Sequence, residues 1–375
     1  MSKAFSPSPL FQRVERARRR KHKFNDTQIT LAHGSGGRAT HELIEGVFLE
    51  YFRNPLLERL EDQAVFELDK SPAHGMDGKS QRLAYTTDSY VVSPIFFPGG
   101  DIGKLAVCGT VNDLAMSGAR PLYLSVGFIL EEGFEVAELK RLLDSMRAAA
   151  TEANVQIVTG DTKVVQKGSA DRVFINTSGI GVIEAPLDLS ATNAQPGDKV
   201  LLSGTLGDHG TTIMIARGEL ELETDIASDC APLNSLVAEI IAEADRHGDL
   251  TKLRCLRDPT RGGLATTLNE FALSAEVGIE IQEDLIPVRE EVKGACEILG
   301  LDPLYVANEG KLVAIVAPDL AEALLSTMQQ NQYGSDACLI GEVKSDPPGI
   351  VTMRTGFGGT RIVDMLVGEQ LPRIC

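Results

Sequence analysis

The sequence predicts an α/β (α+β) protein with two domains and a C-terminal tail. Its 375 residues are enough for two domains of ordinary size, each with its own core. Strand-like runs alternate with helical runs through both halves of the chain. A polar segment punctuated by proline and glycine, residues 184–198, separates the two halves. We therefore expect an extension over 1–28, an N-terminal domain over 29–184, a C-terminal domain over 185–355 and a mobile tail over 356–375.

The first domain is expected to contain four strands and two helices. Alternating apolar residues predict the strands, and an apolar repeat with helical period predicts the helices. Asp101 stands directly before the first helical run, where its carboxylate can accept hydrogen bonds from free backbone amides, so we interpret it as a helix cap. The expected strands are 83–92, 122–130, 156–165 and 172–183, and the expected helices are 102–118 and 135–153.

The second domain shows a similar rhythm of strands and helices, without a short repeat. The expected strands are 199–204, 253–258, 278–282, 311–318 and 337–343, and the expected helices are 232–247, 262–275, 289–299 and 318–330.

The tail starts with Gly356, Gly358 and Gly359 and ends with a cysteine, Cys375. We interpret the glycines as a hinge, because glycine gives a chain the most backbone freedom. A terminal thiol on such an arm can travel between active sites, whereas the alternative is an ordinary disordered terminus.

The charge distribution is uneven. The formal net charge is -17, yet residues 1–23 hold eight Lys and Arg against the single Glu15, which leaves 28 minus 52, or -24, for residues 24–375. A body so acidic repels nucleic acid, and we expect no nucleic acid partner. The basic segment is best explained as a solvated, disordered extension, although contact with an acidic partner or RNA is the alternative.

The chain shows neither a membrane span nor a secretory signal, so we expect no membrane partner. The six cysteines lie far apart, with no CxxC pair and no Cys/His spacing typical of zinc. Free thiols favour a reducing compartment, and we expect a cytoplasmic protein.

Carboxylates are the most informative candidates for chemistry. Neither GxxxxGK[ST] nor GxGxxG occurs at a strand–helix junction, so a nucleotide would need another anchor. Magnesium held by carboxylates is the common alternative, because this ion prefers oxygen ligands and uses phosphates for the remaining positions. The four aspartates that lie among apolar or small residues are Asp62, Asp88, Asp113 and Asp258.

On a helix, Asp113 would share its face with Ala106, Gly109 and Ser117. All three are small, so we expect this face to be cleared for the approach of something bulky.

Glycine-rich turns accompany these aspartates, at 33–37, 160–162, 207–210 and 261–263. Backbone amides in such turns bind phosphate oxygens, although ordinary loops use the same residues. Lys163 and Glu309 are the nearby titratable candidates, and the alternative is that both lie on the surface.

Several motifs together resemble the HypE family of hydrogenase maturation proteins, over Ile29 to Cys375. This family belongs to the PurM-like superfamily of ATP-dependent enzymes, with aminoimidazole ribonucleotide synthetase and selenophosphate synthetase. The final PRIC is peculiar to the HypE family, and the basic extension is not explained by it. The motifs are GSGG, LEDQA, TTDSYVVSPIFFPGGDIGKLAVCGTVNDLAMSGARP, GDTKVV, LGDHG, DPTRGGL, NEG and PRIC.

The resemblance implies a two-domain PurM-like fold, with a homodimer formed through the N-terminal sheet and an α/β sandwich as the C-terminal domain. It implies that the transferase HypF carbamoylates the Cys375 thiol. ATP-dependent dehydration of this S-carboxamide to an S-cyanate (a thiocyanate) then supplies the cyanide ligands for the iron of [NiFe]-hydrogenase. A complex of HypC and HypD is the implied cyanide acceptor.

The resemblance also implies roles for single residues. The implied magnesium ligands are Asp62, Asp88, Asp113 and Asp258. The residues implied to contact ATP are Asp88, Asp113, Gly160, Asp161 and Thr162. Cys375 is implied to carry the substrate, Glu309 to be the base, and Lys163 to polarise Glu309 or balance its charge, and to offset the terminal carboxylate beside the thiol.

Two other functions remain open at this point. Selenophosphate synthesis needs a reactive cysteine or selenocysteine in the N-terminal glycine loop, and no cysteine precedes Cys108. A passive thiol carrier with a decayed ATP site is the second, and the retained acidic residues count against it.

Overall fold

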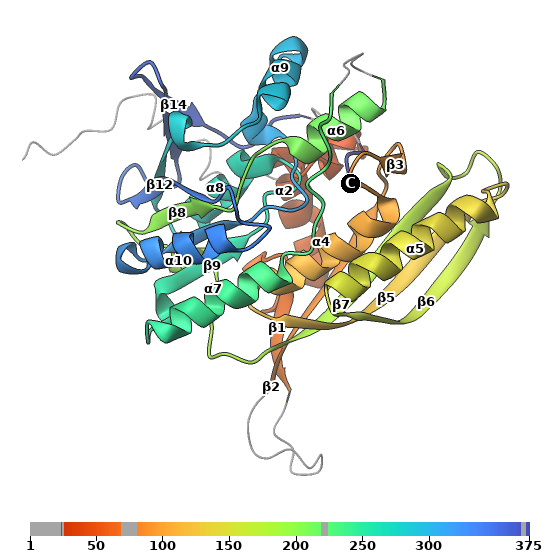
Figure 1. Ribbon diagram of the computed structural model, residues 1–375, viewed down its shortest axis with the longest axis horizontal. Helices are drawn as coiled ribbons and strands as arrows, with labels where there is room; N and C mark the ends of the chain where they lie inside the picture. The colour runs from red at the N-terminus through yellow and green to blue at the C-terminus, as the bar shows by residue number, and fades with distance from the viewer. Residues whose placement is uncertain (1–23, 25, 69–80, 219–223, 369–372) are drawn as a thin grey trace, which may run out of the picture.

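The computed structural model describes residues 24, 26–68, 81–218, 224–368 and 373–375. Most of the expected basic extension over 1–28 therefore lies outside the described residues. No helix in the described part of the chain is long and apolar enough to cross a membrane. Figure 1 shows two sheets side by side, each with helices packed against it.

The first sheet has five strands in the order β1-β2-β7-β5-β6. All neighbours are antiparallel except β5 and β6, which run parallel. The strands are β1 (Ala64–Leu68), β2 (Gln81–Tyr90), β5 (Arg120–Glu131), β6 (Gln156–Val165) and β7 (Val173–Ile183). Four of them confirm the predicted strands of this half, and β1 was not predicted.

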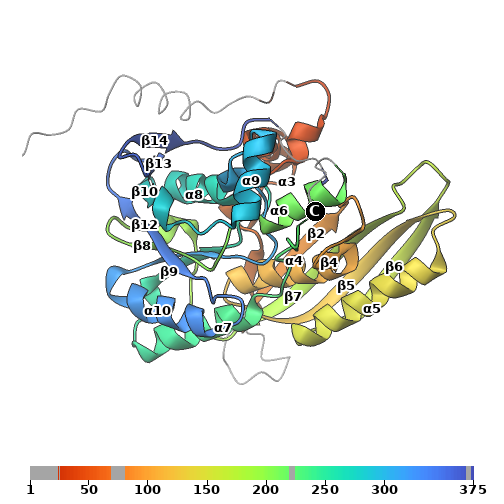
Figure 2. The same cartoon turned by 45° about the horizontal axis from the view of Figure 1, so that its top comes forward.

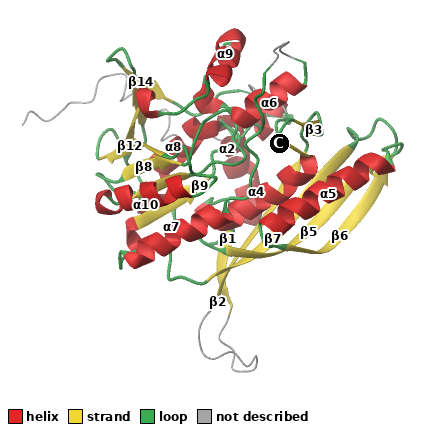
Figure 3. Cartoon of the chain, in the orientation of Figure 1, coloured by secondary structure: helices red, strands yellow, loops and turns green. Residues whose placement is uncertain are grey.

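Two helices, α4 (Ile102–Met116) and α5 (Val136–Glu152), lie on one face of this sheet (Figure 3). Both confirm predicted helices. The predicted cap is also confirmed, because the Asp101 carboxylate accepts hydrogen bonds from the backbone amides of Gly103 and Lys104 at 2.8 and 2.9 Å. Helix α4 is buried almost all round, since the sheet covers one side and the second domain the other.

The small face of α4 holds a tyrosine of this chain. A Cβ atom at Gly109 would lie 2.3 Å from the hydroxyl oxygen of Tyr90, so only glycine lets the tyrosine approach this closely. We expected this face of α4 to be free for a bulky group. At Gly109 the bulky group is the side chain of Tyr90, the last residue of β2.

The second sheet has seven strands in the order β14-β13-β10-β12-β8-β11-β9. Its strands are β8 (Lys199–Leu202), β9 (Leu253–Arg257), β10 (Gly278–Gln282), β11 (Val313–Val316), β12 (Cys338–Lys344), β13 (Val351–Arg354) and β14 (Thr360–Val363). The helices around it are α6 (Asp208–Ala216), α7 (Asn234–Arg246), α8 (Gly263–Ser274), α9 (Glu290–Leu299) and α10 (Pro318–Gln330).

Both faces of this sheet are covered. On one face α8 packs against Val200 and Leu202, and on the other α7 and α10 pack against Leu201. Because successive strand residues point to opposite faces, a strand covered on both sides must be apolar where it is covered, as β8 is over the buried residues 200–202. The five predicted strands and four predicted helices of this half are confirmed, and α6, β13 and β14 were not predicted.

The predicted boundary at residue 355 divides a hairpin. Strands β13 and β14 pair antiparallel, so residues 360–363 belong to the second sheet and the predicted tail start at 356 is wrong. The glycines that we interpreted as a hinge form the turn of this hairpin, where the Thr355 amide donates to the Gly359 carbonyl at 2.9 Å and Gly358 has a φ of 83°. Turn formation explains these glycines, because Gly358 adopts a backbone conformation that glycine favours.

Short elements complete the fold. Near the N-terminus the chain forms α2 (Arg38–Leu43), a π-helix η2 (Ile44–Phe48) and α3 (Leu49–Phe52). The two-stranded ribbon of β3 (Phe96–Phe97) and β4 (Gly100–Asp101) lies beside α6, and Figures 1 and 2 place the C-terminus next to both. Short 3-10 turns are η1 (Leu31–Gly34), η3 (Leu57–Arg59), η5 (Ala191–Asn193), η6 (Leu250–Lys252), η7 (Glu283–Leu285) and η8 (Pro303–Tyr305).

Candidate active site at the domain junction

The four aspartates singled out from the sequence come together. Asp62 precedes β1, Asp88 lies in β2, Asp113 in α4 and Asp258 directly after β9. Burial raises the pKa of Asp113 well above its usual range, and the negative charges of the other three aspartates raise it further. Burial and the charge of Asp62 likewise raise the pKa of Asp258 to about 8. One strand, one helix and two loops from both halves of the chain thus place their carboxylates in one electrostatic cluster.

The carboxylate cluster fits a divalent cation in charge and in ligand type. Magnesium takes hard oxygen ligands, and a cation would relieve the repulsion that raises these pKa values. The oxygens themselves face protein partners, since Asp113 accepts a hydrogen bond from Thr86 Oγ1 at 2.8 Å and Asp62 lies 3.1 Å from Arg257 Nε. Among the described residues no group of three or more acidic, histidine or cysteine side chains is arranged to hold a metal. A bound ion would therefore require these side chains to turn.

A pocket of about 620 Å³ opens beside the carboxylate cluster. This volume lies within the range of small-molecule sites, about 300–1,000 Å³. One part of its wall is apolar, with Ile44, Leu56, Leu57, Leu60 and Tyr85, and another part is charged, with Asp62, Asp258, Arg257, Arg261 and Glu270. An apolar wall suits a flat aromatic base, and a charged wall suits phosphates with their cation.

Arg257 is a buried cation that the sequence analysis missed. Its side chain is 7% exposed and forms ion pairs with Glu61, Asp62 and Glu270. His41 extends this network, because its Nε2 lies 2.8 Å from Glu270 Oε1. Burial alone would raise the pKa of Glu270, but the hydrogen bond with His41 and the charge of Arg257 hold it below the usual value. The three acids balance the charge of Arg257. Their ion pairs hold its side chain in place as part of the pocket wall.

The end of the chain lies inside the protein. The Val91 amide donates to the main-chain carboxylate oxygen of Cys375 at 3.0 Å, and the Ser93 amide donates to the Arg373 carbonyl at 3.2 Å. In return, Arg373 Nε donates to the Val91 carbonyl at 3.0 Å. The last three residues thus bind alongside the segment after β2, in the way that a peptide adds to a strand edge.

His209 also holds this end of the chain. Its Nε2 lies 2.8 Å from the Ile374 carbonyl, and its Nδ1 lies 2.7 Å from Ser228 Oγ. Burial lowers the pKa of His209, so the imidazole is neutral, with its Nε2 proton on the tail carbonyl and its Nδ1 accepting from the serine. The sequence had indicated only the glycines of the turn at 207–210, and the neighbouring histidine carried no separate signal.

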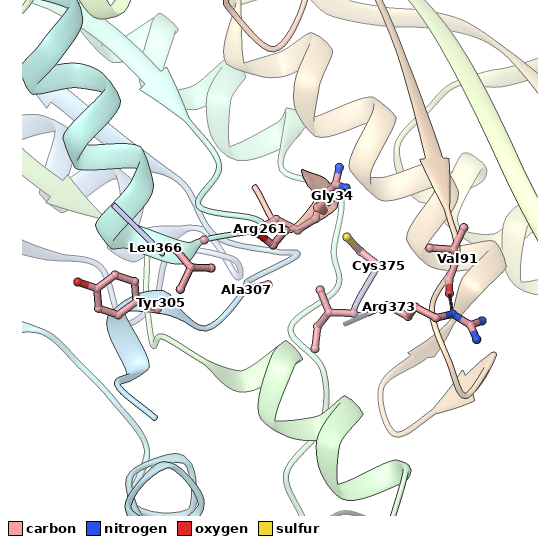
Figure 4. A pocket seen from close by; sticks show the side chains of 11 residues that line it. Gly34, Val91, Arg261, Tyr305, Ala307, Leu366, Arg373 and Cys375 are labelled. Atoms are coloured by element: carbon pink, nitrogen blue, oxygen red, sulfur yellow. Dashed lines mark hydrogen bonds between the residues drawn. The ribbon is translucent and has the colours of Figure 1, made fainter. Parts of the chain in front are cut away.

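The Cys375 thiol lies in a small cavity of about 60 Å³ (Figure 4). Cys375 is only 8% exposed, and burial raises the pKa of its thiol. The charge of Arg261 opposes that rise, whereas the charges of Glu309 and Asp88 and a hydrogen bond with Glu309 add to it. The thiol is therefore protonated at neutral pH, and Arg261 lines its cavity.

Glu309 is buried, with 3% exposure, and its position is fixed from both domains. Its backbone amide donates to Asp229 Oδ1 at 3.1 Å, and Asn112 of α4 reaches its carbonyl at 3.5 Å. Burial raises the pKa of the Glu309 carboxyl group well above its usual range. One carboxyl oxygen, Oε1, has no hydrogen-bond partner, so Glu309 retains the capacity to accept a proton from a group attached to Cys375.

Lys163 and the residues before it, 160–162, lie away from the Cys375 thiol. They belong to β6, the edge strand of the first sheet, where Lys163 Nζ pairs with Asp161 Oδ2 at 2.5 Å and both side chains are at least 70% exposed. Gly160 has a packing reason of its own, since a Cβ there would lie 2.3 Å from the Val126 carbonyl oxygen. Within one chain the structure does not bring Gly160, Asp161, Thr162 or Lys163 to the thiol, and Arg261 is the cation whose charge lowers the pKa of the Cys375 thiol.

Family comparisons agree with this architecture. The model of the AIR synthase related protein N-terminal domain matches residues 60–183, and that of the C-terminal domain matches residues 195–354. The carbamoyl dehydratase HypE of Bradyrhizobium diazoefficiens is 54% identical over 360 residues, which cover 96% of this chain and 100% of the relative. The Escherichia coli K12 HypE is 48% identical over 347 residues, covering 92% and 99%.

Solved structures give the same result. A crystal structure of HypE in complex with ATP has a TM-score of 0.74 and 50% identity, and the match covers 93% of this chain and 100% of that one. A HypE–HypF complex has a TM-score of 0.78 and 51% identity, covering 86% and 99%. The chain matches both AIR synthase related domains and shares the PurM-like architecture. About half of its aligned residues are identical to those of its relatives, and these findings place it within one family. The chain belongs to the HypE family of carbamoyl dehydratases.

Proposed function

We propose that this protein dehydrates a carbamoyl group carried on its own Cys375, in an ATP-dependent reaction that serves hydrogenase maturation. The observation that carries the proposal is the burial of both the Cys375 thiol and the Glu309 carboxyl group within electrostatic reach of Asp88 of the carboxylate cluster. A terminal thiol near a proton acceptor, with a nucleotide-sized pocket nearby, has the parts that dehydration needs.

The dehydration proceeds through phosphorylation of the carboxamide oxygen and the loss of two N–H protons. The oxygen of an S-carboxamide is a poor leaving group, so it must first attack the γ-phosphorus of ATP and displace ADP. Glu309 accepts one N–H proton as the carbon–nitrogen bond order rises. The carbon–oxygen bond then breaks, the second N–H proton leaves with phosphate, and an S-cyanate remains on Cys375. In total the carboxamide and ATP give S-cyanate, ADP, phosphate and a proton.

The nucleotide is assigned to the pocket beside the carboxylate cluster. Its apolar wall would receive the base, and Asp88 and Asp113 are the proposed residues toward the phosphates. Asp62, Asp88, Asp113 and Asp258 would hold Mg²⁺, which neutralises phosphate charge during transfer. A HypE crystal structure contains ATP, and the high identity supports the same ligand here.

Partners follow from the family. A related HypE was crystallised with HypF, so we propose HypF as the donor of the carbamoyl group, and HypC with HypD as the cyanide acceptor. All six cysteines are unpaired, which supports a cytoplasmic setting.

We also propose a homodimer formed through the first sheet. Its strands expose Tyr85, Tyr123 and Ile129, each above 40%, and β6 is exposed along almost its whole length. Lys163 on β6 would then act across the dimer interface, since it does not reach Glu309 within one chain.

Phosphate release tests the proposal. A carbamoylated sample should release one phosphate from Mg-ATP for each Cys375 converted, and a Cys375→Ser sample should release none above background. Phosphate release that is independent of the carbamoyl group would refute the proposed reaction. A passive carrier would release no phosphate in either sample.

A further inference from the structure

Arg261 joins the two pockets of the site. Its side chain lines both the cavity of the Cys375 thiol and the larger pocket beside the carboxylate cluster. In Figure 4 the labelled Arg261 and Cys375 lie next to each other, with Gly34 beside them. No role followed for this residue from the sequence, which had indicated only the glycines of the turn at 261–263.

Several contacts fix the position of Arg261. A Cβ atom at Gly36 would lie 2.6 Å from both the Cβ and the carbonyl oxygen of Arg261, so the glycine turn at 33–37 packs directly against its backbone. Arg261 Nη1 donates to the Gly34 carbonyl at 3.3 Å, and Nη2 lies 3.8 Å from Asp88 Oδ1. The side chain is 42% exposed, so it remains accessible from the pocket.

The loop that carries Arg261 is tied to the loop that carries Glu309. Asn308 Nδ2 donates to the Pro259 carbonyl at 3.0 Å, and the Asn308 amide donates to the same carbonyl at 3.2 Å. Asp258, Arg261 and Glu309 are therefore held in fixed relation by one buried asparagine between them. Such preorganisation is what a site needs to stabilise charge that appears only during reaction.

We propose that Arg261 is a catalytic residue of the dehydration, whose guanidinium group binds the carboxamide oxygen on Cys375 and the phosphoryl group transferred to it. This inference rests on the proposed function. When the oxygen attacks phosphorus, the oxygen–phosphorus bond forms, the bond to ADP breaks, and the new imidate phosphate carries negative charge beside the thiol cavity. Glu309 takes the first N–H proton, and the phosphate that Arg261 holds leaves with the second.

The chemical need for such a cation is specific. The site contains Asp88 and Glu309, whose negative charges, that of Glu309 when it is ionised, repel a phosphorylated intermediate. Arg257 is occupied by three acids, and Lys163 lies on the exposed edge strand. Arg261 is the cation that touches both the thiol cavity and the pocket, and its planar fork matches two phosphate oxygens.

Three variants test this role with Mg-ATP and protein carbamoylated at Cys375. Arg261→Gln keeps most of the side-chain stem but removes the charge, and should lower the single-turnover rate of S-cyanate formation at saturating ATP by about 100-fold or more, while the ATP concentration that gives half of the maximal rate changes little. Arg261→Lys keeps the charge without the fork and should lose about tenfold. Arg246→Gln, an exposed arginine at the end of α7, is the matched control and should retain the wild-type rate.

The outcomes are distinct. A wild-type single-turnover rate in Arg261→Gln overturns the inference. So does an unchanged maximal rate that needs more ATP, because Arg261 would then bind only the nucleotide. If Arg261→Gln fails to fold, Arg261→Lys decides the question, since a full rate in this variant contradicts a contact through the fork. If the wild-type protein forms no S-cyanate, the proposed function itself fails; if the wild type does and Arg261→Gln equals it, only this inference fails.

Discussion

The thiol of Cys375 and the carboxyl group of Glu309 are both buried, and the Glu309 carboxyl group is close enough to raise the pKa of the thiol. The two residues come from the end of the chain and from the loop before β11, and burial raises the pKa of both. A carboxyl group with a raised pKa is a stronger base once ionised. The pair therefore suits proton removal from a group attached to the thiol.

Replacement of Glu309 tests its role as the base. Glu309→Gln should still accept a carbamoyl group on Cys375 but form S-cyanate about 100-fold more slowly or worse, because general base catalysis is worth roughly 10²- to 10⁴-fold. Single-turnover kinetics measure this rate. Glu291→Gln, on the exposed face of α9, should react normally. A Glu309→Gln rate equal to wild type removes the assignment.

The direction in which the dehydration rate changes with pH tests the assignment of Glu309 as the base. Only the ionised form of Glu309 accepts a proton, and its pKa lies above the usual carboxyl value. The rate of dehydration should therefore rise with pH through the neutral range, and the rising limb should be absent in Glu309→Gln. A wild-type rate that falls across the same range contradicts a glutamate base.

Replacement of Asp113 distinguishes an ATP-dependent enzyme from a passive thiol carrier. Asp113→Asn keeps the shape but removes one charge of the carboxylate cluster, so Mg-ATP-dependent S-cyanate formation should fall by more than about tenfold. Carbamoylation of Cys375 should continue. Asp144→Asn on α5, whose side chain is 70% exposed, is the control. Hydrogenase maturation at the normal level with Asp113→Asn would support a passive carrier.

Stability should depend on pH through the carboxylate cluster. The pKa of Asp62 is raised to about 6 and that of Asp258 to about 8, from an ordinary value of 3.8. The folded protein thus holds protons that the unfolded chain has already released. The stability from these groups is present below the unfolded pKa and is lost as pH rises through about 6 and then about 8.

Thermal unfolding measures this dependence. Asp258→Asn should raise Tm near pH 8 by about 2 °C for each kcal/mol of repulsion relieved, and should change Tm little near pH 5. Mg²⁺ should stabilise the wild type more near pH 8 than near pH 5, and this difference should shrink in Asp258→Asn. A larger Mg²⁺ effect at the lower pH would contradict the cluster as a cation site.

His209 controls how firmly the tail end is held. His209→Leu removes the hydrogen bond to the Ile374 carbonyl, which is worth about 0.5–1.5 kcal/mol, so Cys375 should be alkylated about 2- to 13-fold faster. Mass spectrometry after iodoacetamide treatment measures this rate. Asp171→Asn, which removes the part-exposed ion pair with Arg373, should have a smaller effect. Unchanged alkylation in His209→Leu would show that the strand-like hydrogen bonds alone hold the tail.

Periodicity predicted the long elements of the fold well. Helices α4 and α5 follow from apolar spacing and from a capping aspartate, and the strands of both sheets other than β1, β13 and β14 follow from apolar spacing. Strands β13 and β14 were missed because glycine at 356, 358 and 359 is equally compatible with a hinge and a turn. Pairing with a strand far along the chain decides between the two, and local sequence does not contain it. The domain division at 184 stays a prediction.

The site was predictable in its carboxylates but not in its cations. Four aspartates stood out because acids among apolar residues are unusual. Arg257 and Arg261 were missed because surface arginines are common, and only the fold shows that one is enclosed by acids and the other lies beside Cys375. Lys163 followed from the resemblance, and its place beside Glu309 stays a prediction that needs a second chain.

Intact-protein mass spectrometry tests the central claim most directly. Purified protein is incubated with HypF, carbamoyl phosphate and Mg-ATP, beside a Cys375→Ala control. We expect Cys375 to gain the mass of a carbamoyl group and then to lose the mass of one water only when ATP is available for the second step, and we expect the control to stay unmodified. A carbamoyl adduct that persists in the presence of Mg-ATP, or a Cys375 that is never modified, would contradict the account.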